Sequence, residues 1–445
     1  METGLSRHSR AWAIYFALVI FKMALAICMP LEDRLSGDEV YYVGKARYLY
    51  RHGTYPAIER PVSAERTLSY SDFRPPGYAM YVAAFLPFGE THADLRRCIR
   101  WSQFLLDVAY TTLLLGVALQ FNRAKGFPIA SAALLGIQPW TSAYIASIYP
   151  DTLVAFLATT GILGLSIFVG AGKWSARVPA LLSGSTLLSL SFGIRPEMVV
   201  LAPALVLIAL MLAKRKTSWR AVAAYGMLSA LPFSALVGLN IAYRWHVERQ
   251  FRIFGEFRHA TPGLNRWTQT WIGLQTLKEE LLFGGLTRGG MDVGRFARLP
   301  KRAFADAAER NALESIVKNA HARGYMTVEE DDAFMEIARA RIAADPLTYY
   351  LWTRVYNSFH LWINMSNAAH YLSGMALVPR GVSKLLTAAM FIVKIAILFG
   401  FLGGACAVAL RWPLAMQAWH ASFVLLGASF VTMRTFVVGF YINHA

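Results

Sequence analysis

Long apolar runs separated by short polar connections dominate the first half of the chain. A helix of about 20 apolar residues crosses the ~30 Å hydrocarbon core of a bilayer. Two further runs near the end of the chain have the same character. The pattern therefore predicts an all-α polytopic membrane protein with a bundle of about nine to eleven transmembrane helices. The expected spans are residues 11–29, 101–121, 128–148, 152–170, 178–194, 198–213, 219–243, 385–410 and 414–433.

Residues 76–88 are apolar but too few to cross the hydrocarbon core, so we expect a juxtamembrane or re-entrant helix there. Lys and Arg concentrate in the cytoplasmic connections of membrane proteins. If 76–88 does not cross, the short basic connections share the cytoplasmic side with the N-terminus, while Arg96, Arg97 and Arg100 fall outside as an exception. Those connections contain Arg123, Lys125, Lys173, Arg177 and residues 214–216.

Three regions follow from this pattern. Residues 1–243 form an N-terminal transmembrane module whose first outer loop, residues 30–100, is long and polar. Residues 244–345 form a helical extracytoplasmic insert. Residues 346–445 combine an aromatic-rich segment, expected to be interfacial or spanning, with the last spans.

The insert is expected to contain two helices. The first covers about 303–323 and stops at Gly324, a residue type that often terminates helices. The second opens at Thr327, which with Glu330 has the spacing of a capping box, and it ends before Pro346.

Composition agrees with a membrane class and excludes others. Of the 445 residues, 56% are hydrophobic and only 16% charged, against about 25% in a typical soluble domain. The net charge of +17 lies largely in connections near lipid headgroups, so we expect membrane lipids and no nucleic acid as partners. Cys28, Cys98 and Cys406 have no CxxC spacing and are interpreted as small buried hydrophobes. The first apolar run is interpreted as an uncleaved signal anchor.

Candidate chemistry gathers in the connections expected on the extracytoplasmic side. Asp38 and Glu39 follow the first span, where a charge is costly unless it has a partner or a function. Tyr42, one turn later, offers an aromatic face with a hydroxyl. The motif Arg-Pro-Pro-Gly-Tyr, which contains Arg74 and Tyr78, closes the same loop. The next two outer connections contribute Asp151, Arg195 and Glu197.

In the order and common side of these motifs, the chain resembles the GT-C-fold glycosyltransferases. The resemblance is to the protein O-mannosyltransferase-like and aminoarabinose-transferase-like families and covers residues 11–260 best. It implies transfer of a sugar from a polyprenyl-phosphate donor to a lipid, polysaccharide or protein acceptor, at the outer face of the cytoplasmic (inner) membrane. It also implies that Asp38 is the catalytic carboxylate and Asp151 a second carboxylate of the site. Residues 433–436 depart from an Arg-Tyr-Arg-Pro-like element of the relatives, so Arg434 receives no role.

The chemistry suits this resemblance. A sugar on a lipid phosphate has a good leaving group, so only the attacking hydroxyl needs a base. Asp38 and Glu39 are the expected catalytic residues, with Asp38 as the base, and direct displacement predicts inversion at the anomeric carbon. The guanidinium of Arg74 is suited to phosphate oxygens. The expected substrate-binding residues are Tyr42, Arg74, Tyr78, Asp151, Arg195 and Glu197.

Each of these residues also has a structural alternative. The carboxylates can cap helices, and the arginines can pair with nearby acids or with lipid headgroups. The alternatives are Asp38 paired with Arg34 or capping a helix near Val40, Glu39 capping, Asp151 capping the span 152–170, Arg195 paired with Glu197, and Arg74 on lipid.

Two questions stay open from the sequence. No histidine or cysteine spacing indicates a metal site, so we expect no cofactor, with a divalent cation at Asp38 and Glu39 as the alternative. Lys22 inside the first span is expected to face other helices or to snorkel, but it also motivates a transporter or flippase as an alternative function. A polysaccharide polymerase that uses a lipid-diphosphate oligosaccharide is a further alternative.

Overall fold

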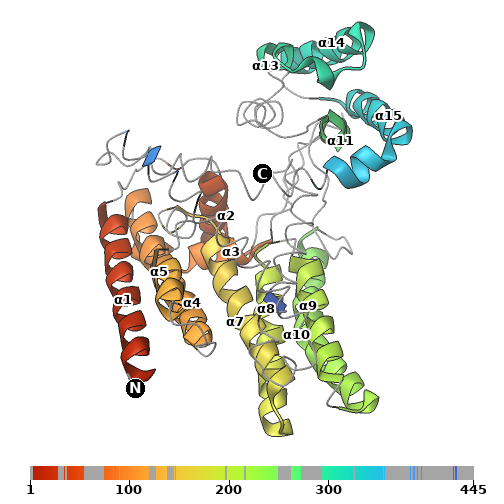
Figure 1. The fold of residues 1–445 in the computed structure, drawn as a ribbon. Helices are drawn as coiled ribbons and strands as arrows, with labels where there is room; N and C mark the ends of the chain where they lie inside the picture. The colour runs from red at the N-terminus through yellow and green to blue at the C-terminus, as the bar shows by residue number, and fades with distance from the viewer. Residues whose placement is uncertain are drawn as a thin grey trace. The chain divides into compact units, whose positions relative to one another are not determined.

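The structure is a computed structural model, and its described residues form helices with no β-strand among them (Figure 1). The chain divides into two compact units. Unit 1 comprises Met1–Pro56, Arg74–Phe251 and Met365–Val431, and unit 2 comprises Ala57–Phe73, Arg252–Asn364 and Thr432–Ala445. The described residues are 4–28, 38–54, 75–89, 91–119, 127–137, 147–195, 198–214, 217–248, 262–271, 293–323 and 326–353, with a few isolated positions besides.

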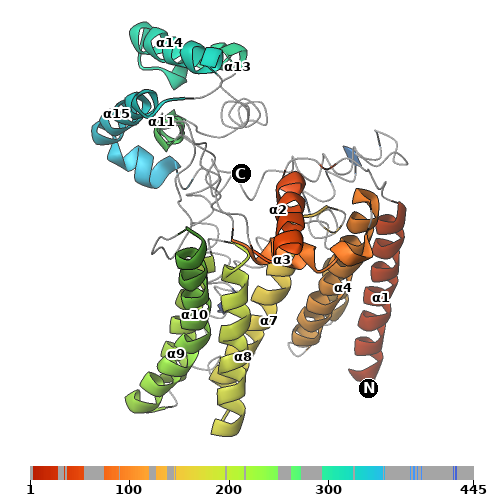
Figure 2. The same cartoon turned by 180° about the vertical axis from the view of Figure 1, so that it is seen from behind.

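Unit 1 contains the long helices (Figure 2). Three described helical stretches are long and apolar enough to cross a membrane, namely His92–Leu119, Asp151–Gly170 and Trp219–Ala242, which identifies a multi-pass membrane protein by length and composition. The helices of unit 1 are α1 (Gly4–Cys28), α2 (Asp38–His52), α3 (Gly77–Ala83), η1 (Leu86–Phe88), α4 (His92–Leu119), α5 (Phe127–Ile137), α7 (Asp151–Gly170), α8 (Trp174–Phe192), α9 (Met198–Lys214) and α10 (Trp219–Glu248).

The expected spans between residues 11 and 243 agree with these helices except around α4 and α5, and the expected spans 385–410 and 414–433 lie outside the described residues apart from isolated positions. The short elements α3 and η1 confirm that 76–88 is too short to span. Helix α4 begins at His92, nine residues before the expected start, so the placement of Arg96 and Arg100 in a polar loop was wrong. Helix α5 ends at Ile137, and residues 138–144 of the expected span lie outside the described part of the chain.

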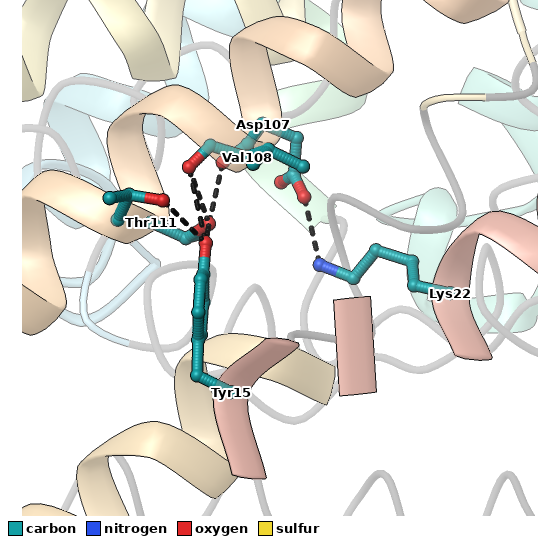
Figure 3. A network of polar contacts seen from close by, with 6 residues as sticks. Tyr15, Lys22, Asp107, Val108 and Thr111 are labelled. Atoms are coloured by element: carbon teal, nitrogen blue, oxygen red, sulfur yellow. Dashed lines mark hydrogen bonds and ion pairs between the residues drawn. The ribbon is translucent and has the colours of Figure 1, made fainter. Parts of the chain in front are cut away.

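Helix α1 is held to α4 by buried polar contacts deep in the bundle (Figure 3). The Lys22 ammonium donates to Asp107 Oδ2 at 2.8 Å, and both side chains are buried. One to two turns further along α4, Thr111 Oγ1 lies 2.7 Å from the Tyr15 hydroxyl, which also donates to the Val108 carbonyl. Lys22 therefore faces another helix, which was the first of the two expectations for it.

Helices α7 and α8 pack so closely that glycine is required at their contact. A Cβ added at Gly164 would lie 2.9 Å from the Cα of Gly184, and one added at Gly184 would lie 2.9 Å from the Gly161 carbonyl oxygen. Real Cβ atoms do not approach so closely, so larger residues would push the two helices apart. Small residues at helix contacts allow the same close approach in other membrane proteins.

Unit 2 has a core of its own. Its elements are α11 (Pro262–Trp271), α13 (Val293–Ala297), η2 (Lys301–Ala303), α14 (Ala307–Arg323), α15 (Val328–Ala344) and η3 (Thr348–Trp352). The fully buried Trp267 ring lies 5.3 Å from the Phe334 ring and 6.2 Å from the Phe296 ring, between centroids. The expected capping box is confirmed, since Thr327 Oγ1 accepts from the Glu330 amide and the Glu330 carboxylate accepts from the Thr327 amide.

A buried carboxylate joins α15 to the start of α11. Asp331 accepts hydrogen bonds from the amides of Gly263 (2.7 Å) and Leu264 (2.9 Å), which have no partner within their own helix. Gly263 must be glycine there, because an added Cβ would lie 1.8 Å from the Asp331 carbonyl oxygen. Burial outweighs the two amide bonds and raises the pKa of Asp331 from 3.8 to about 6.

Breaking the α1–α4 ion pair on one side is expected to destabilise unit 1. Asp107→Ala leaves the Lys22 ammonium buried without its carboxylate, a change that costs about 3–5 kcal/mol in buried pairs. The double variant Lys22→Met/Asp107→Leu removes both charges and should regain most of that loss. Thermal unfolding in one detergent checks this, with Arg97→Ala, which breaks an exposed pair with Asp94, as the control. Equal losses in the single and double variants would contradict the argument.

The raised pKa of Asp331 predicts that unit 2 loses stability as pH rises. Below pH 3.8 the carboxyl is protonated whether unit 2 is folded or not, and between 3.8 and about 6 only the folded form holds the proton. The unfolding free energy should therefore fall by roughly 3 kcal/mol across this window. The measurement is the opening free energy at a cysteine replacing buried Ala320, followed with a disulfide reagent active in acid. Asp331→Asn should flatten this dependence, and an unchanged slope would contradict it.

Candidate active site

The predicted outer connections of unit 1 meet one another at one end of its helices. Helices α2 and α3 lie at that end of α4 and α7 in both views (Figures 1 and 2). The start of α2 bonds to the segment before α7, and the start of α3 bonds to the segment after α8. Positions that are far apart in the sequence, and were grouped only by their expected side, are therefore neighbours.

Glu39 joins three segments at this end. Its carboxylate is buried and accepts from Arg96 Nη2 of α4 at 2.6 Å and from the Ile148 amide, before α7, at 2.9 Å. The Arg96 guanidinium compensates the Glu39 charge, which would be costly alone in an apolar setting. Glu39 is thus engaged by protein donors at both oxygens and fixes the first turn of α2.

Asp38 is the first residue of α2. Its side chain lies outside the described part of the structure, so the base assigned to it stays a prediction. Because Asp38 adjoins Glu39, the contacts of Glu39 with Arg96 and Ile148 also determine where the Asp38 backbone lies. A carboxylate at the first residue of a helix also benefits from the partial positive charge of the helix N-terminus.

Tyr42 and Tyr78 form a buried aromatic contact beneath this end. Their ring centroids are 4.8 Å apart and their planes nearly perpendicular. Gln103 Nε2 of α4 donates to the Tyr78 hydroxyl at 3.3 Å and to the Ser147 carbonyl at 2.9 Å. Burial, followed by the neighbouring Tyr81 and Tyr42, raises the pKa of Tyr78 well above its usual value, so its hydroxyl stays protonated. The two predicted substrate contacts are therefore inside the fold, packed on each other.

Asp151 and Arg195 form an ion pair between the ends of α7 and α8. Arg195 Nη2 donates to Asp151 Oδ1 at 2.7 Å, and the side chains remain 31% and 24% exposed, so solvent or a ligand can reach both. The N-cap of α7 is Pro150, with no side-chain cap bond, so the alternative that Asp151 caps this helix is wrong. Arg195 was expected to bind substrate or to pair with Glu197, and its described partner is Asp151.

Close contact between two glycines joins α3 to the same place. The Gly77 amide donates to the Gly193 carbonyl at 2.7 Å, and a Cβ on Gly77 would lie 2.4 Å from that oxygen. Gly77 belongs to the Arg-Pro-Pro-Gly-Tyr motif, whose glycine is thus required by packing as well as by turning. Tyr78 follows Gly77, and Arg195 lies two residues after Gly193. The contact between the two glycines therefore places Tyr78 and Arg195 on adjoining segments.

Several predicted site residues are outside the described residues, namely Arg74, Glu197 and the side chain of Asp38. Sequence reasoning missed Arg96 and Gln103, which hold Glu39, Tyr78 and Ser147. The available signal was the spacing of polar residues along α4, which places them on one helical face. That face contains Arg96, Arg100, Gln103, Asp107 and Thr111, all buried.

The arrangement brings carboxylates and guanidinium groups together at one end of unit 1. Arg96 is committed to Glu39, and Arg100 Nη1 donates to the Ala26 carbonyl at 2.8 Å. Asp151 and Arg195 form a partly exposed pair that ligands can reach, and an anion could exchange with the Asp151 carboxylate for Arg195. Among the described residues, no cluster of three or more His, Cys, Asp or Glu side chains could hold a metal ion.

Comparison with known proteins finds a structural similarity but no match in sequence. No protein-family model matches the chain, and no curated protein matches it in sequence. A structural match is the crystal structure of ArnT from Cupriavidus metallidurans bound to undecaprenyl phosphate. The two chains are 14% identical with a TM-score of 0.37, and the match covers 99% of this chain and 77% of that one.

Proposed function

We propose that this chain is a GT-C-type glycosyltransferase of the cytoplasmic membrane. It would transfer a sugar from a polyprenyl-phosphate donor to a lipid, polysaccharide or protein acceptor at the outer face. The observation that carries the proposal is the meeting of the predicted outer segments, through Glu39 with Ile148, Gly77 with Gly193, and Asp151 with Arg195. Motifs that the resemblance groups by order and side are thereby neighbours in space.

The proposed reaction is a direct displacement. The acceptor hydroxyl gives its proton to Asp38 while its oxygen attacks the anomeric carbon, and the bond from that carbon to the phosphate oxygen breaks. The lipid phosphate leaves with the bonding electron pair. Because the hydroxyl attacks from the face opposite to the phosphate, the anomeric configuration inverts. Asp38 is the catalytic base, and Arg195 is the described cation suited to the departing phosphate. Glu39 then acts by positioning α2, through Arg96 and Ile148.

The leading alternative is a transporter or flippase, since charged residues inside a membrane often mark a transport path. Lys22 motivated that reading, and its pairing with Asp107 gives it a structural role. The purified chain in sealed vesicles with labelled lipid donor separates the two. Glycosylated product supports transfer, and movement of the donor without product supports transport. Product analysis also separates a monosaccharide donor from the lipid-diphosphate oligosaccharide of a polymerase.

Replacing the proposed base should slow transfer sharply. Asp38→Asn keeps size and the start of α2 but cannot accept the proton, so kcat should fall by about 10²–10⁴-fold, the usual contribution of a general base. Initial rates with a polyprenyl-phosphate sugar and mass-spectrometric detection of product measure this. Asp332→Asn, an exposed carboxylate change in unit 2, is the control and should retain activity. Transfer at the native rate by a folded Asp38→Asn protein would exclude this residue as the base.

The charge bias predicts which end of unit 1 faces outward. Arg97 is exposed at the start of α4, beside the candidate site, and Ser175 is exposed near the start of α8. In intact spheroplasts, a single cysteine at Arg97 should react with an impermeant maleimide and one at Ser175 should not. Both should react after lysis, which controls for accessibility. The reverse pattern would place the candidate site in the cytoplasm and remove the outward-facing mechanism.

A further inference from the structure

The exposed apolar side chains of unit 2 are confined to one short segment. In the described part of this unit, every large hydrophobic residue that is exposed lies between 347 and 355. Many of the other large apolar side chains described in this unit pack in the core around Trp267. The exposed set consists of Leu347, Tyr350, Leu351, Trp352 and Val355, and we call it the aromatic face.

The segment is two-sided, and its inner side is firmly held. Tyr349 and Thr353, four residues apart, are buried, and the Tyr349 hydroxyl donates to Gln269 Oε1 at 2.8 Å. Thr353 Oγ1 donates to the Thr348 carbonyl at 2.9 Å. Asp345 Oδ1 accepts from the Thr348 amide at the start of η3. The aromatic face is thus the outward side of a seated element, rather than a loose end of the chain.

The chemistry of this face fits the boundary between lipid headgroups and acyl chains. Tyr and Trp concentrate at that depth in membrane proteins because their rings are apolar and their tips are polar. An exposed cation adjoins the segment, since Arg266 lies over the Tyr349 ring at 5.3 Å, where it can meet headgroup phosphates. Other helices of the same chain are long and apolar enough to cross a bilayer. An apolar patch of this kind on an otherwise polar surface usually marks a membrane or partner contact.

We infer that the aromatic face seats unit 2 on the bilayer, with Tyr350, Leu351 and Trp352 at the headgroup–acyl boundary and Arg266 among the phosphates. Unit 2 is then a peripheral domain held at a fixed depth, instead of one that moves freely on its connections. Removing three large apolar side chains from water favours such seating. The inference does not depend on the transfer reaction.

The test measures membrane depth in the full-length protein. With Cys28, Cys98 and Cys406 replaced by serine, a single cysteine at Leu351 carries an environment-sensitive fluorophore, and one at the exposed Lys318 of α14 is the matched control. Both proteins are placed in nanodiscs of phosphatidylcholine and phosphatidylglycerol. The fluorophore at Leu351 should emit at shorter wavelength, lose intensity to nitroxide-labelled lipid and resist an aqueous quencher. The fluorophore at Lys318 should show the opposite behaviour.

A second measurement leaves the native cysteines and the aromatic face nearly unchanged. Brominated lipid should quench the tryptophan fluorescence of the native protein more than that of Trp352→Phe, and the difference isolates Trp352.

Quenching of the Leu351 fluorophore by the aqueous reagent would overturn the inference by showing a solvated face. Resistance to both quenchers would also overturn it, because the face would then be covered by protein.

Discussion

A polar side chain inside an apolar bundle is unstable without a partner, and the buried polar face of α4 between Arg96 and Thr111 imposes this constraint on unit 1. Arg96 binds Glu39, Arg100 binds the Ala26 carbonyl, and Gln103 binds the Tyr78 hydroxyl. Asp107 completes the series with Lys22. Together these contacts reach α1, α2 and α3, so the positions of three segments depend on one helix. The neighbourhood of the candidate site is therefore assembled by buried polar pairing as much as by apolar packing.

For the described helices of unit 1, sequence patterns were sufficient in most cases, and they grouped the segments that hydrogen bonds join near Glu39, Gly77 and Asp151. Apolar length located α7 to α10 closely, and the capping box located the start of α15. The pattern failed at α4, where arginines in the first two turns looked like a loop. A charge with a specific partner can enter the bundle, and hydropathy along the chain carries no information about a partner such as Glu39, 57 positions away.

The two adjacent acids illustrate what a sequence motif leaves undetermined. Asp38 and Glu39 are chemically alike and were assigned together, but Glu39 is buried between Arg96 and Ile148. Consecutive residues on a helix point about 100° apart, so one can anchor the helix while the other faces elsewhere. Which residue anchors is decided by tertiary contacts, and the motif alone does not contain them. The same holds for Asp151, whose partner Arg195 lies one helical hairpin away.

The glycine contact between α7 and α8 has a consequence at a distance. Asp151 begins α7 and Arg195 follows α8, so the spacing of this ion pair is set by how closely the two helices lie. Gly164 is 13 residues from Asp151, or about 20 Å along the helix. A single methyl group introduced at Gly164 would push α7 and α8 apart. The separation would extend to the ends of the two helices, where the two charges meet. Positions inside a helix contact, although they carry no functional group, can thereby change the reach of a guanidinium at the end of the helices.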